Sequence, residues 1–527
     1  MSGRAGYQAI PMQTYGAVPN TAHRSRTSVA FSQLYGIFHV VVGAVLPLTF
    51  AFKQYNNTAV GHEKELQFWH LDAYYIYILG ASVLAMAAMQ IFRLMETHDG
   101  LESHQAASTY IKGGAALFGA CGILQNVFKL GSVIDGSNHG HGDHDSVAAM
   151  EAALAALFIL LLWLFVCAHS NKCITKWKRF SRIFIMLLWA ACMSCWIRDF
   201  VTEVMDDLEH QYFNSSICRL HNRTRGNKST HMMYALGDFK YHVTGDGDGK
   251  DTFQDIREKS SSILIPGAME FYLIMSGFMY VMYGNIGRQQ EARPHEPPTK
   301  HRNLKCSFIG LGLGFVVLIA SIAIVVTHYL TEKHASDNKN GVPSMFYYGF
   351  IVSVYPMAII GNLASHFKMR RSDDWQIDDG REDELRLPML LMYVSASGLF
   401  ITSVFTIIAS SLTIHSVHEP VLLLIHECLK VIDIFVQVIF LYDALHRKPP
   451  ENFRPTFMRN IMMFLIFTNF MFWWTNIYEL KDVYVSPIQY CFYGFNLWSI
   501  VLHLTTPLGI YFRFHSCVLY LEIWLSG

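Results

Sequence analysis

The stretch that decides the fold is PVLLLIHECLKVIDIFVQ, residues 420–437. Its Leu, Ile, Val and Phe residues are typical of a helix that crosses a membrane, for which about 20 apolar residues are needed. It nevertheless carries four ionisable residues, His426, Glu427, Lys430 and Asp433, and it ends in Gln437. A charged side chain at the centre of a bilayer costs at least ~3 kcal/mol on insertion scales. Side chains kept at that cost indicate a function inside the membrane.

The composition of the whole chain also predicts a membrane protein. Hydrophobic residues make up 52% of the 527 residues and charged residues 16%, whereas about a quarter of the residues are charged in soluble domains. The formal net charge is +0. Because a nucleic-acid partner favours a basic excess, we expect no nucleic acid among the partners.

Apolar runs of membrane length recur along the entire sequence. The first, near residues 33–53, lacks a cleavage site and is interpreted as an uncleaved span. We predict an all-α polytopic protein with twelve transmembrane helices and both termini on one side of the membrane. The spans fall near residues 33–53, 68–92, 110–134, 148–169, 181–206, 260–284, 306–330, 344–366, 388–413, 419–443, 457–479 and 487–512.

The polar, proline-bearing segment RQQEARPHEPPTKHR (288–302) divides these spans into six and six. Two such halves would be parallel repeats about an axis along the membrane normal. A short internal similarity supports the repeat: Arg182, Trp196 and Asp199 have the same spacing as Arg459, Trp473 and Asn476. We predict a cytoplasmic N-terminal segment (1–32), an N-terminal half (33–287) containing a long extracellular loop (207–259), and a cytoplasmic linker (288–305). A C-terminal half (306–513) and a short C-terminal tail (514–527) follow.

The distribution of Lys and Arg predicts the orientation. Basic residues such as Lys172, Lys176 and Lys368 gather in alternate short loops. The positive-inside rule then places both termini in the cytoplasm. We expect the membrane to be the plasma membrane. Acceptor sequons for N-glycosylation all fall in loops on the opposite side. They are Asn56, Asn214, Asn222 and Asn227.

Cysteine and histidine usage suggests no cofactor. Most of the ten cysteines lie in apolar runs and only Cys218 falls in a long polar loop, so we expect no intrachain extracellular disulfide. The loop SNHGHGDHD (137–145) carries His139, His141 and His144. These histidines can bind Zn²⁺, sense acid or remain solvated. Their spacing matches no strong metal motif, and we predict no resident metal.

The ionisable residues of span ten form a stripe on one helix face. At ~100° per residue, His426, Lys430, Asp433 and Gln437 align at steps of four, three and four, with Glu427 about a quarter turn away. Such a stripe faces other helices or a wet cavity rather than lipid. Further polar residues in other spans are Asp199, Glu203, Glu270, Asn476 and His503.

Carboxylates and imidazoles inside a membrane are suited to moving protons. We therefore predict a proton-selective ion channel without enzymatic activity. The alternative is a proton-coupled secondary transporter, although the loop RLMETHDGLES lacks the Gly-x-x-x-Asp-Arg pattern of common twelve-span transporters. A membrane adaptor would need larger cytoplasmic segments, and a di-iron enzyme would need a second histidine cluster. For lone amides, simple interhelical hydrogen bonds of ~0.6 kcal/mol remain an alternative.

Two stretches resemble the otopetrin family of proton channels. The segment MEFYLIMSGFMYVMYGNIG (269–287) resembles the family's buried Glu before an apolar run closing on Asn-Ile-Gly. The chain end WSIVLHLTTPLGIYFRFHSCVLYLEIW (498–524) resembles its last span and its Pro-x-x-Ile-x-x-Arg-x-His tail. The resemblance implies a homodimer in which each half of a subunit is a six-helix barrel, surrounded by membrane lipids with a sterol among the candidates.

The resemblance also implies proton routes through each barrel and along the interface between the halves. By motif, Glu270 and His503 would meet at that interface, and Glu203 would serve the N-terminal barrel. Asp433 and Gln437 would serve the C-terminal barrel. Two departures from the family pattern each remove a polar group from a route: the family's usual Asn is Cys192 here, and its usual Tyr is Phe271.

Overall fold

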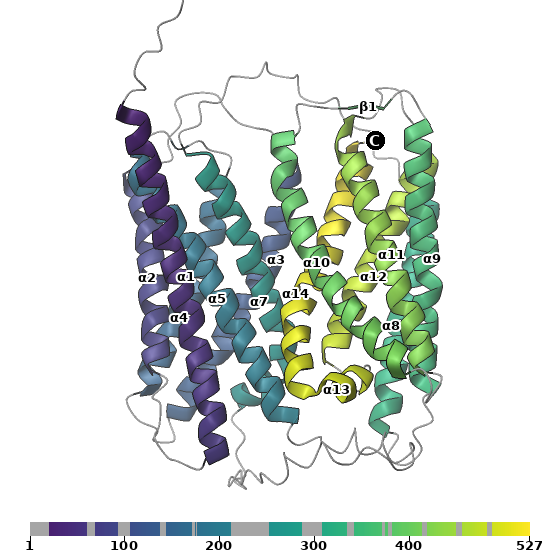
Figure 1. Ribbon diagram of the computed structural model, residues 1–527, viewed down its shortest axis with the longest axis horizontal. Coiled ribbons are helices and arrows are strands. Elements are labelled where there is room, and N and C mark those ends of the chain that lie inside the picture. The colour runs from purple at the N-terminus through teal and green to yellow at the C-terminus, as the bar shows by residue number, and fades with distance from the viewer. Residues whose placement is uncertain are drawn as a thin grey trace, which may run out of the picture.

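The computed structural model is a bundle of long, roughly parallel and antiparallel helices (Figure 1). It describes residues 20–60, 69–92, 106–137, 144–170, 174, 177–211, 252–286, 308–334, 342–371, 375–377, 382–413, 419–448, 456–481 and 487–526. Those residues form twelve helices of 23 residues or more, the short helix α13, and two strands of two residues. The long helices are α1 (Asn20–Val60), α2 (Trp69–Ile91), α3 (Ala106–Ser137), α4 (His144–His169), α5 (Lys178–Gln211), α7 (Thr252–Gly284), α8 (Phe308–His334), α9 (Val342–Arg371), α10 (Glu382–Thr413), α11 (Glu419–Leu445), α12 (Thr456–Lys481) and α14 (Phe495–Ser526).

The length and composition of these helices confirm an all-α polytopic membrane protein. Ten of the described helices are long and apolar enough to cross a membrane, and large apolar side chains such as Phe315, Ile360 and Phe435 are exposed on the bundle surface. The remaining long helices, α11 and α14, carry the buried charged residues Asp433 and Arg513, which lower their apolar character. The beginning of α1 and the C-terminus lie at the same end of the bundle (Figure 1), called here the proximal end; the opposite end is the distal end.

Several predicted boundaries differ from the structure. The last predicted span, 487–512, is broken at Gly494, whose φ of 81° favours glycine, into α13 (Pro487–Tyr493) and α14. The predicted tail at 514–527 is wrong, because α14 continues to Ser526 with an apolar face packed against its neighbours. The N-terminal helix begins at Asn20, so the predicted segment 1–32 is partly helical.

Cys491 contradicts the expectation that no disulfide forms. It lies on α13 and is disulfide-bonded, whereas the other described cysteines are free. The sequence placed it inside an apolar run, but the break at Gly494 puts α13 at the distal end of the bundle instead (Figure 1). A cysteine at that end is near connecting segments rather than in the apolar interior.

The helices pack as two halves with the same arrangement. The N half comprises α1 to α7 and the C half comprises α8 to α14; they occupy the left and the right of the bundle in Figure 1. In the N half, α3 packs on α7 and α4, α5 packs on α1 and α7, and α2 packs on α4. The corresponding pairs pack in the C half: α10 on α14 and α11, α12 on α8 and α14, and α9 on α11.

The burial pattern of each helix recurs in its counterpart and sets a residue-by-residue correspondence. Buried residues of α4 at Glu151, Ala155, Phe158 and Leu162 have the spacing of His426, Lys430, Asp433 and Gln437 on α11, and all are buried. The pattern of α5 likewise matches α12 when Arg182 is aligned with Arg459. On α2, the buried residues Tyr75, Leu79 and Met86 have the spacing of the buried Ile351, Tyr355 and Asn362 on α9. Matching Pro266 of α7 with Pro507 of α14 aligns their buried faces as well. The repeat predicted from three residues thus extends through the packing.

The small antiparallel sheet closes the proximal end of the C half. Strand β1 (Gln376–Ile377), which follows α9, pairs with β2 (Arg447–Lys448), which follows α11. The Arg447 side chain donates to the backbone carbonyl of Trp375 at 3.2 Å. These contacts fix the proximal end of α11, the helix that carries the stripe of ionisable residues.

Candidate functional site

The stripe on α11 faces the interior of the C half. His426, Lys430, Asp433 and Gln437 are 2%, 4%, 0% and 0% exposed. The opposite face of the same helix exposes Ile425, Ile432 and Ile439. Helical periodicity therefore separates the ionisable face from the lipid-facing one, as predicted.

Four polar residues from three helices meet at the middle of this face, and they are called here the central cluster: Asp433, Gln437, Asn469 and Arg513. The Nη1 atom of Arg513 on α14 donates to Asp433 Oδ2 at 2.8 Å and lies 3.3 Å from Asn469 Oδ1 and 3.5 Å from Gln437 Oε1. The Gln437 amide also donates to Asn469 Oδ1 at 3.1 Å. Arg513 and Asn469 were not among the predicted site residues. The signal for Arg513 was available, since it is a charge inside the apolar end of the chain.

A second group of ionisable side chains lies on the distal side of the central cluster. Glu427 Oε1 accepts a hydrogen bond from Lys430 Nζ at 2.7 Å and lies 3.2 Å from His426 Nδ1. The His426 ring packs between Tyr348 and Tyr355, with centroid distances of 5.5 and 5.4 Å. Tyr355 interacts electrostatically with Glu427, Asp433 and Arg513, so it connects this group to the central cluster.

Polar contacts continue to the distal end of the C half. The Tyr347 hydroxyl donates to Glu479 Oε1 at 3.1 Å, and Tyr478 lies 2.7 Å from His328 Nδ1. Glu479 also interacts electrostatically with Tyr355. These residues come from α8, α9 and α12; of these helices, α9 packs on α11 and α8 packs on α12.

The proximal side of the central cluster is polar as well. The Tyr520 hydroxyl donates to Asn362 Oδ1 at 2.5 Å and interacts electrostatically with Asp433 and Arg513. Further along, Asp443 Oδ2 lies 2.9 Å from Arg370 Nε and 3.6 Å from His366 Nδ1.

Together these groups are called here the polar row. The step from Tyr520 to His366 passes the ring of Phe440, whose centroid lies 6.2 and 6.5 Å from theirs. Along α11 the row runs from His426 to Asp443, which at 1.5 Å per residue is about 26 Å of a hydrocarbon core ~30 Å thick. Its members are Tyr347, Tyr355, Asn362, His366, His426, Glu427, Lys430, Asp433, Gln437, Asp443, Asn469, Glu479, Arg513 and Tyr520.

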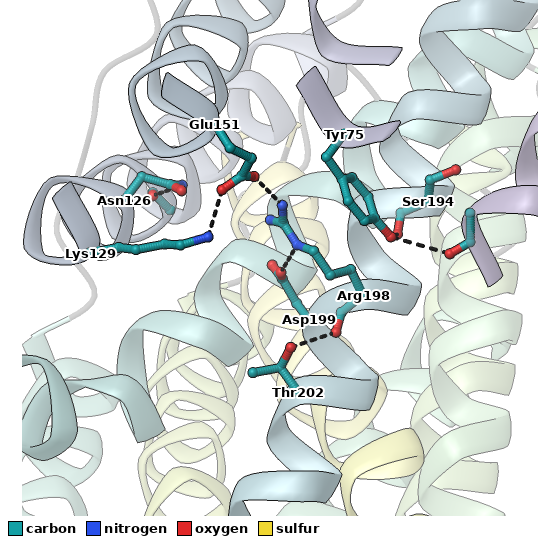
Figure 2. Close-up of polar contacts among 10 residues, drawn as sticks. Tyr75, Asn126, Lys129, Glu151, Ser194, Arg198, Asp199 and Thr202 are labelled. Carbon is teal, nitrogen blue, oxygen red and sulfur yellow. Dashed lines mark hydrogen bonds and ion pairs between the residues drawn. The ribbon is translucent and has the colours of Figure 1, made fainter. Parts of the chain in front are cut away.

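The N half contains a different arrangement of charges near its distal end (Figure 2). Glu151, 0% exposed, accepts from Lys129 Nζ at 2.6 Å and pairs with Arg198 Nη1. Arg198 also donates from Nε to Asp199 Oδ1 at 3.0 Å. Asp72 interacts electrostatically with Lys129, Glu151 and Arg198. These five residues are called here the N-half charge cluster.

Tyr75 supports this cluster from α2. Its ring lies under the Arg198 guanidinium, 4.7 Å from Cζ to the ring centroid, and its hydroxyl lies 3.2 Å from the carbonyl oxygens of Gly43 and Ser194 (Figure 2). The sequence pointed to Asp199 and missed Glu151, because a single Glu near a helix end gives no stripe.

Below the charge cluster, the N half is apolar where the C half is polar. Seven buried polar residues in and next to the central cluster have an apolar or aromatic counterpart that is also buried. The pairs, with the C-half residue first, are Tyr355 and Leu79, Asn362 and Met86, Lys430 and Ala155, Asp433 and Phe158, Gln437 and Leu162, Asn469 and Cys192, and Arg513 and Tyr272. The structure thus brings the predicted residues of span ten into a row, but Asp199 belongs to the separate charge cluster.

The predicted meeting of Glu270 with His503 is not what the structure shows. His503 Nε2 lies 3.6 Å from Glu203 Oε2, so α14 of the C half pairs with α5 of the N half. Glu270 instead faces Tyr511, which is eight residues, about 12 Å, further along α14. Motif resemblance placed both residues at the interface between halves but could not give their depth on the helix.

Glu270 is nonetheless an unusual group. It is 1% exposed, and among the residues that the structure describes its carboxyl has no side-chain hydrogen-bond partner and faces the backbone of Tyr511. In the correspondence of α7 with α14, Glu270 and Tyr511 are equivalent positions, so the pair lies where the two halves face each other. Asn476 on α12 is half-buried beside Gly509 of α14.

Several predicted residues lie outside the described part of the chain. They are His139, His141, Asn214, Asn222 and Asn227. His144 begins α4 and Asn56 lies in α1, but their side chains are also outside the description. Within the described residues, no group of three or more His, Cys, Asp or Glu could hold a metal ion.

Comparison with known proteins identifies the family. The model of the Otopetrin family matches residues 110–514, which include the central cluster, Glu270 and the N-half charge cluster except Asp72. The chain belongs to the otopetrin family. Within this otopetrin, the matched region begins in α3 and ends in α14, so it covers most of both halves.

Named relatives of this otopetrin are proton channels. It is 24% identical over 443 residues to Proton channel OtopLc of Drosophila melanogaster, covering 79% of this chain and 27% of that protein. It is 22% identical over 470 residues to Proton channel OTOP3 of Homo sapiens, covering 80% and 74%. It is 21% identical over 496 residues to Proton channel OTOP1 of Danio rerio, covering 80% and 79%. The chain therefore spans about a quarter of the Drosophila protein and about three quarters of the two vertebrate ones.

Proposed function

We propose that this otopetrin is a proton channel and that protons cross the membrane through the polar row of the C half. The observation that carries the proposal is the succession of polar side chains from Glu479 to Asp443 on α9, α11, α12 and α14, with the buried central cluster between them. The relatives named proton channels support the choice of protons as the transported species.

The chemistry of the row suits protons. Carboxylate, imidazole and phenol groups can take up and release a proton, and water molecules in the gaps between them can pass it on without a wide pore. Asp433 stands at the centre, since it contacts Arg513 and interacts electrostatically with Tyr355 and Tyr520 on both sides. Gln437 and Asn469 orient the Arg513 side chain and offer oxygen atoms to water.

Among its described residues, the N half has no comparable succession of polar side chains. Its charge cluster is paired internally at the distal end, and the positions below it are occupied by side chains such as Ala155, Phe158 and Leu162. The buried phenol of Tyr272 occupies the position of Arg513, but the positions of Lys430, Asp433 and Gln437 carry no side chain that can accept a proton. We therefore assign Asp199 to the structure of the N half and not to the path.

The interface between the halves is the second candidate route. His503 and Glu203 lie near its distal end, and the buried carboxyl of Glu270, which has no ion-pair partner among the described residues, lies deeper. Burying a carboxyl without a cationic partner costs free energy, and such groups mark functional sites in membranes. Protons could cross there if water connects His503 with Glu270.

We also propose the setting in which the channel works. The basic loops favour a plasma-membrane protein with both termini cytoplasmic. External acid would then reach the distal end first and open the path. The apolar side chains exposed on the bundle suit contact with membrane lipids, including a sterol, and with a second copy in a homodimer.

Proton flux tests the proposal directly. In cells that express the chain, acidifying the bath should produce inward current and lower the cytoplasmic pH, without any organic solute. A proton-coupled transporter would instead need its solute. Protein at the cell surface with neither current nor a change of cytoplasmic pH under an imposed gradient would refute the proposal.

A further inference from the structure

Arg513 is a fixed cation in the middle of the membrane. It is 1% exposed, and its guanidinium Cζ lies 4.5 Å from the Phe472 ring centroid and 6.0 Å from that of Tyr355. Its Nη1 atom faces Asp433, Gln437 and Asn469. Nε and Nη2 have no hydrogen-bond partner among the described residues. The aromatic rings and the three oxygen atoms therefore hold the side chain in one place.

The oxygen atoms around Arg513 form the kind of set that a metal cation needs. Asp433 Oδ2, Asn469 Oδ1 and Gln437 Oε1 lie 2.8, 3.3 and 3.5 Å from the same nitrogen. Carboxylate and amide oxygens replace the hydration shell of Na⁺ or K⁺ in selective pores. In this protein, the guanidinium already occupies the centre of that oxygen set.

We propose that Arg513 determines the selectivity of the C-half pathway by excluding Na⁺ and K⁺ from the central cluster while protons pass. This inference rests on the proposed function. It adds a role for a residue that carries no proton itself, because a guanidinium stays charged in proteins.

The charges facing the cluster leave no place for a second cation. On α11, Glu427 is paired with Lys430 at 2.7 Å, and Asp433 is paired with Arg513 at 2.8 Å. The side chains facing Arg513 from α9 and α12, Tyr355 and Asn469, are uncharged. At the central cluster, a sodium ion would meet the positive charges of Lys430 and Arg513, and the carboxylates of Glu427 and Asp433 are already paired with them. Repulsion between like charges is strong where water is scarce.

A proton does not need the oxygen set. The second carboxylate oxygen of Asp433, Oδ1, has no hydrogen-bond partner within the described residues. That oxygen can exchange a proton with water on one side while Oδ2 stays bound to Arg513. The same cluster can thus pass protons and reject larger cations.

Measuring reversal potentials tests the proposal. The wild-type reversal potential should follow the pH gradient and stay unchanged when external Na⁺ is replaced by a large organic cation. In Arg513→Gln, the oxygen set becomes available, and the permeability of Na⁺ relative to H⁺ should rise about tenfold or more. Arg513→Tyr introduces the residue found at the corresponding N-half position, Tyr272, and provides a second variant if the Gln variant folds poorly.

Two further variants separate charge from other effects. Arg513→Lys keeps the positive charge and should keep the channel closed to Na⁺. Arg198→Gln removes the other buried arginine, in the N half, and should leave selectivity unchanged. Leakage of Na⁺ through Arg513→Lys equal to that through Arg513→Gln would overturn the role of charge.

The outcomes distinguish this inference from the proposed function. A surface-expressed wild type without proton current would overturn both. A wild type that conducts protons, together with Gln and Tyr variants whose reversal potential still ignores Na⁺, would overturn the role of Arg513 alone.

Discussion

The two halves of this otopetrin share a helix arrangement and differ in chemistry. Their helices pack in corresponding pairs, and the buried residues of α4 and α11 recur with the same spacing. At the middle of α4 these residues are Phe158 and Leu162, and at the middle of α11 they are Asp433 and Gln437. One packing pattern thus accommodates either an apolar core or a polar row.

The comparison shows that buried charge alone does not define a pathway. Both halves bury ion pairs: Glu151 with Arg198 in the N half, and Asp433 with Arg513 in the C half. Among the residues that the structure describes, polar side chains recur along α11 towards both ends of the C half, whereas the middle of α4 carries Phe158 and Leu162. Breaking a buried ion pair destabilises a protein whether or not it conducts, so function has to be inferred from continuity.

The largest expected effect on proton current comes from Asp433→Asn. Asparagine keeps the shape and can still accept from Arg513, but it cannot take up a proton. Because proton transfer by a positioned group contributes typically ~10²-fold or more, we expect the current per surface channel to fall at least about tenfold. Whole-cell current normalised to surface protein measures this. Phe158→Leu, at the corresponding N-half position, is the control and should leave the current near wild type.

A smaller effect is expected from Gln437→Leu, which introduces the N-half residue of the same position, Leu162. The change removes an oxygen atom from the central cluster but leaves Asp433 and Arg513 paired, so we expect a loss of about threefold to tenfold in current. Proton flux into liposomes measures it. The reverse change, Leu162→Gln, should give no gain, because Phe158 and Ala155 keep the N half apolar. An increase in flux from Leu162→Gln would contradict the claim that the apolar interior of the N half blocks protons.

No effect on current per channel is expected from Glu151→Gln, although stability should fall. The change leaves Lys129 and Arg198 without their shared anion, and removing one partner of a buried ion pair costs about 3–5 kcal/mol. Thermal unfolding of the purified protein should show the loss, and surface expression should drop with it. A normal melting temperature combined with a reduced current per channel would instead place the N-half charge cluster on a proton route.

The fold could be predicted largely from the sequence, because apolar runs of membrane length and the basic loops between them are strong signals. The break at Gly494 could not, since one glycine inside an apolar run has many tolerated conformations. The continuation of α14 to Ser526 was missed for a related reason: Arg513 and His515 are typical of the end of a span, but here they are buried against α10 and α11.

The site could be predicted in part. The stripe on α11 follows from helical spacing, and its residues are buried together as predicted. Its partners Asn469 and Arg513 come from other helices, and spacing within one helix carries no information on such contacts. The predicted meeting of Glu270 with His503 was wrong for the same reason. Which residues meet depends on how α7 and α14 are placed against each other, and spacing within one helix does not give this.

The central claim is that protons cross through the central cluster of the C half. The most direct test replaces this cluster by the side chains found at the corresponding positions of the N half. The fourfold variant Asp433→Phe, Gln437→Leu, Asn469→Cys and Arg513→Tyr replaces the central cluster by residues that pack at the corresponding positions of the same molecule. Proton flux into liposomes containing the purified variant, at matched protein content, should fall to that of empty liposomes. Flux equal to wild type from a folded variant would contradict the account, because protons would then cross elsewhere.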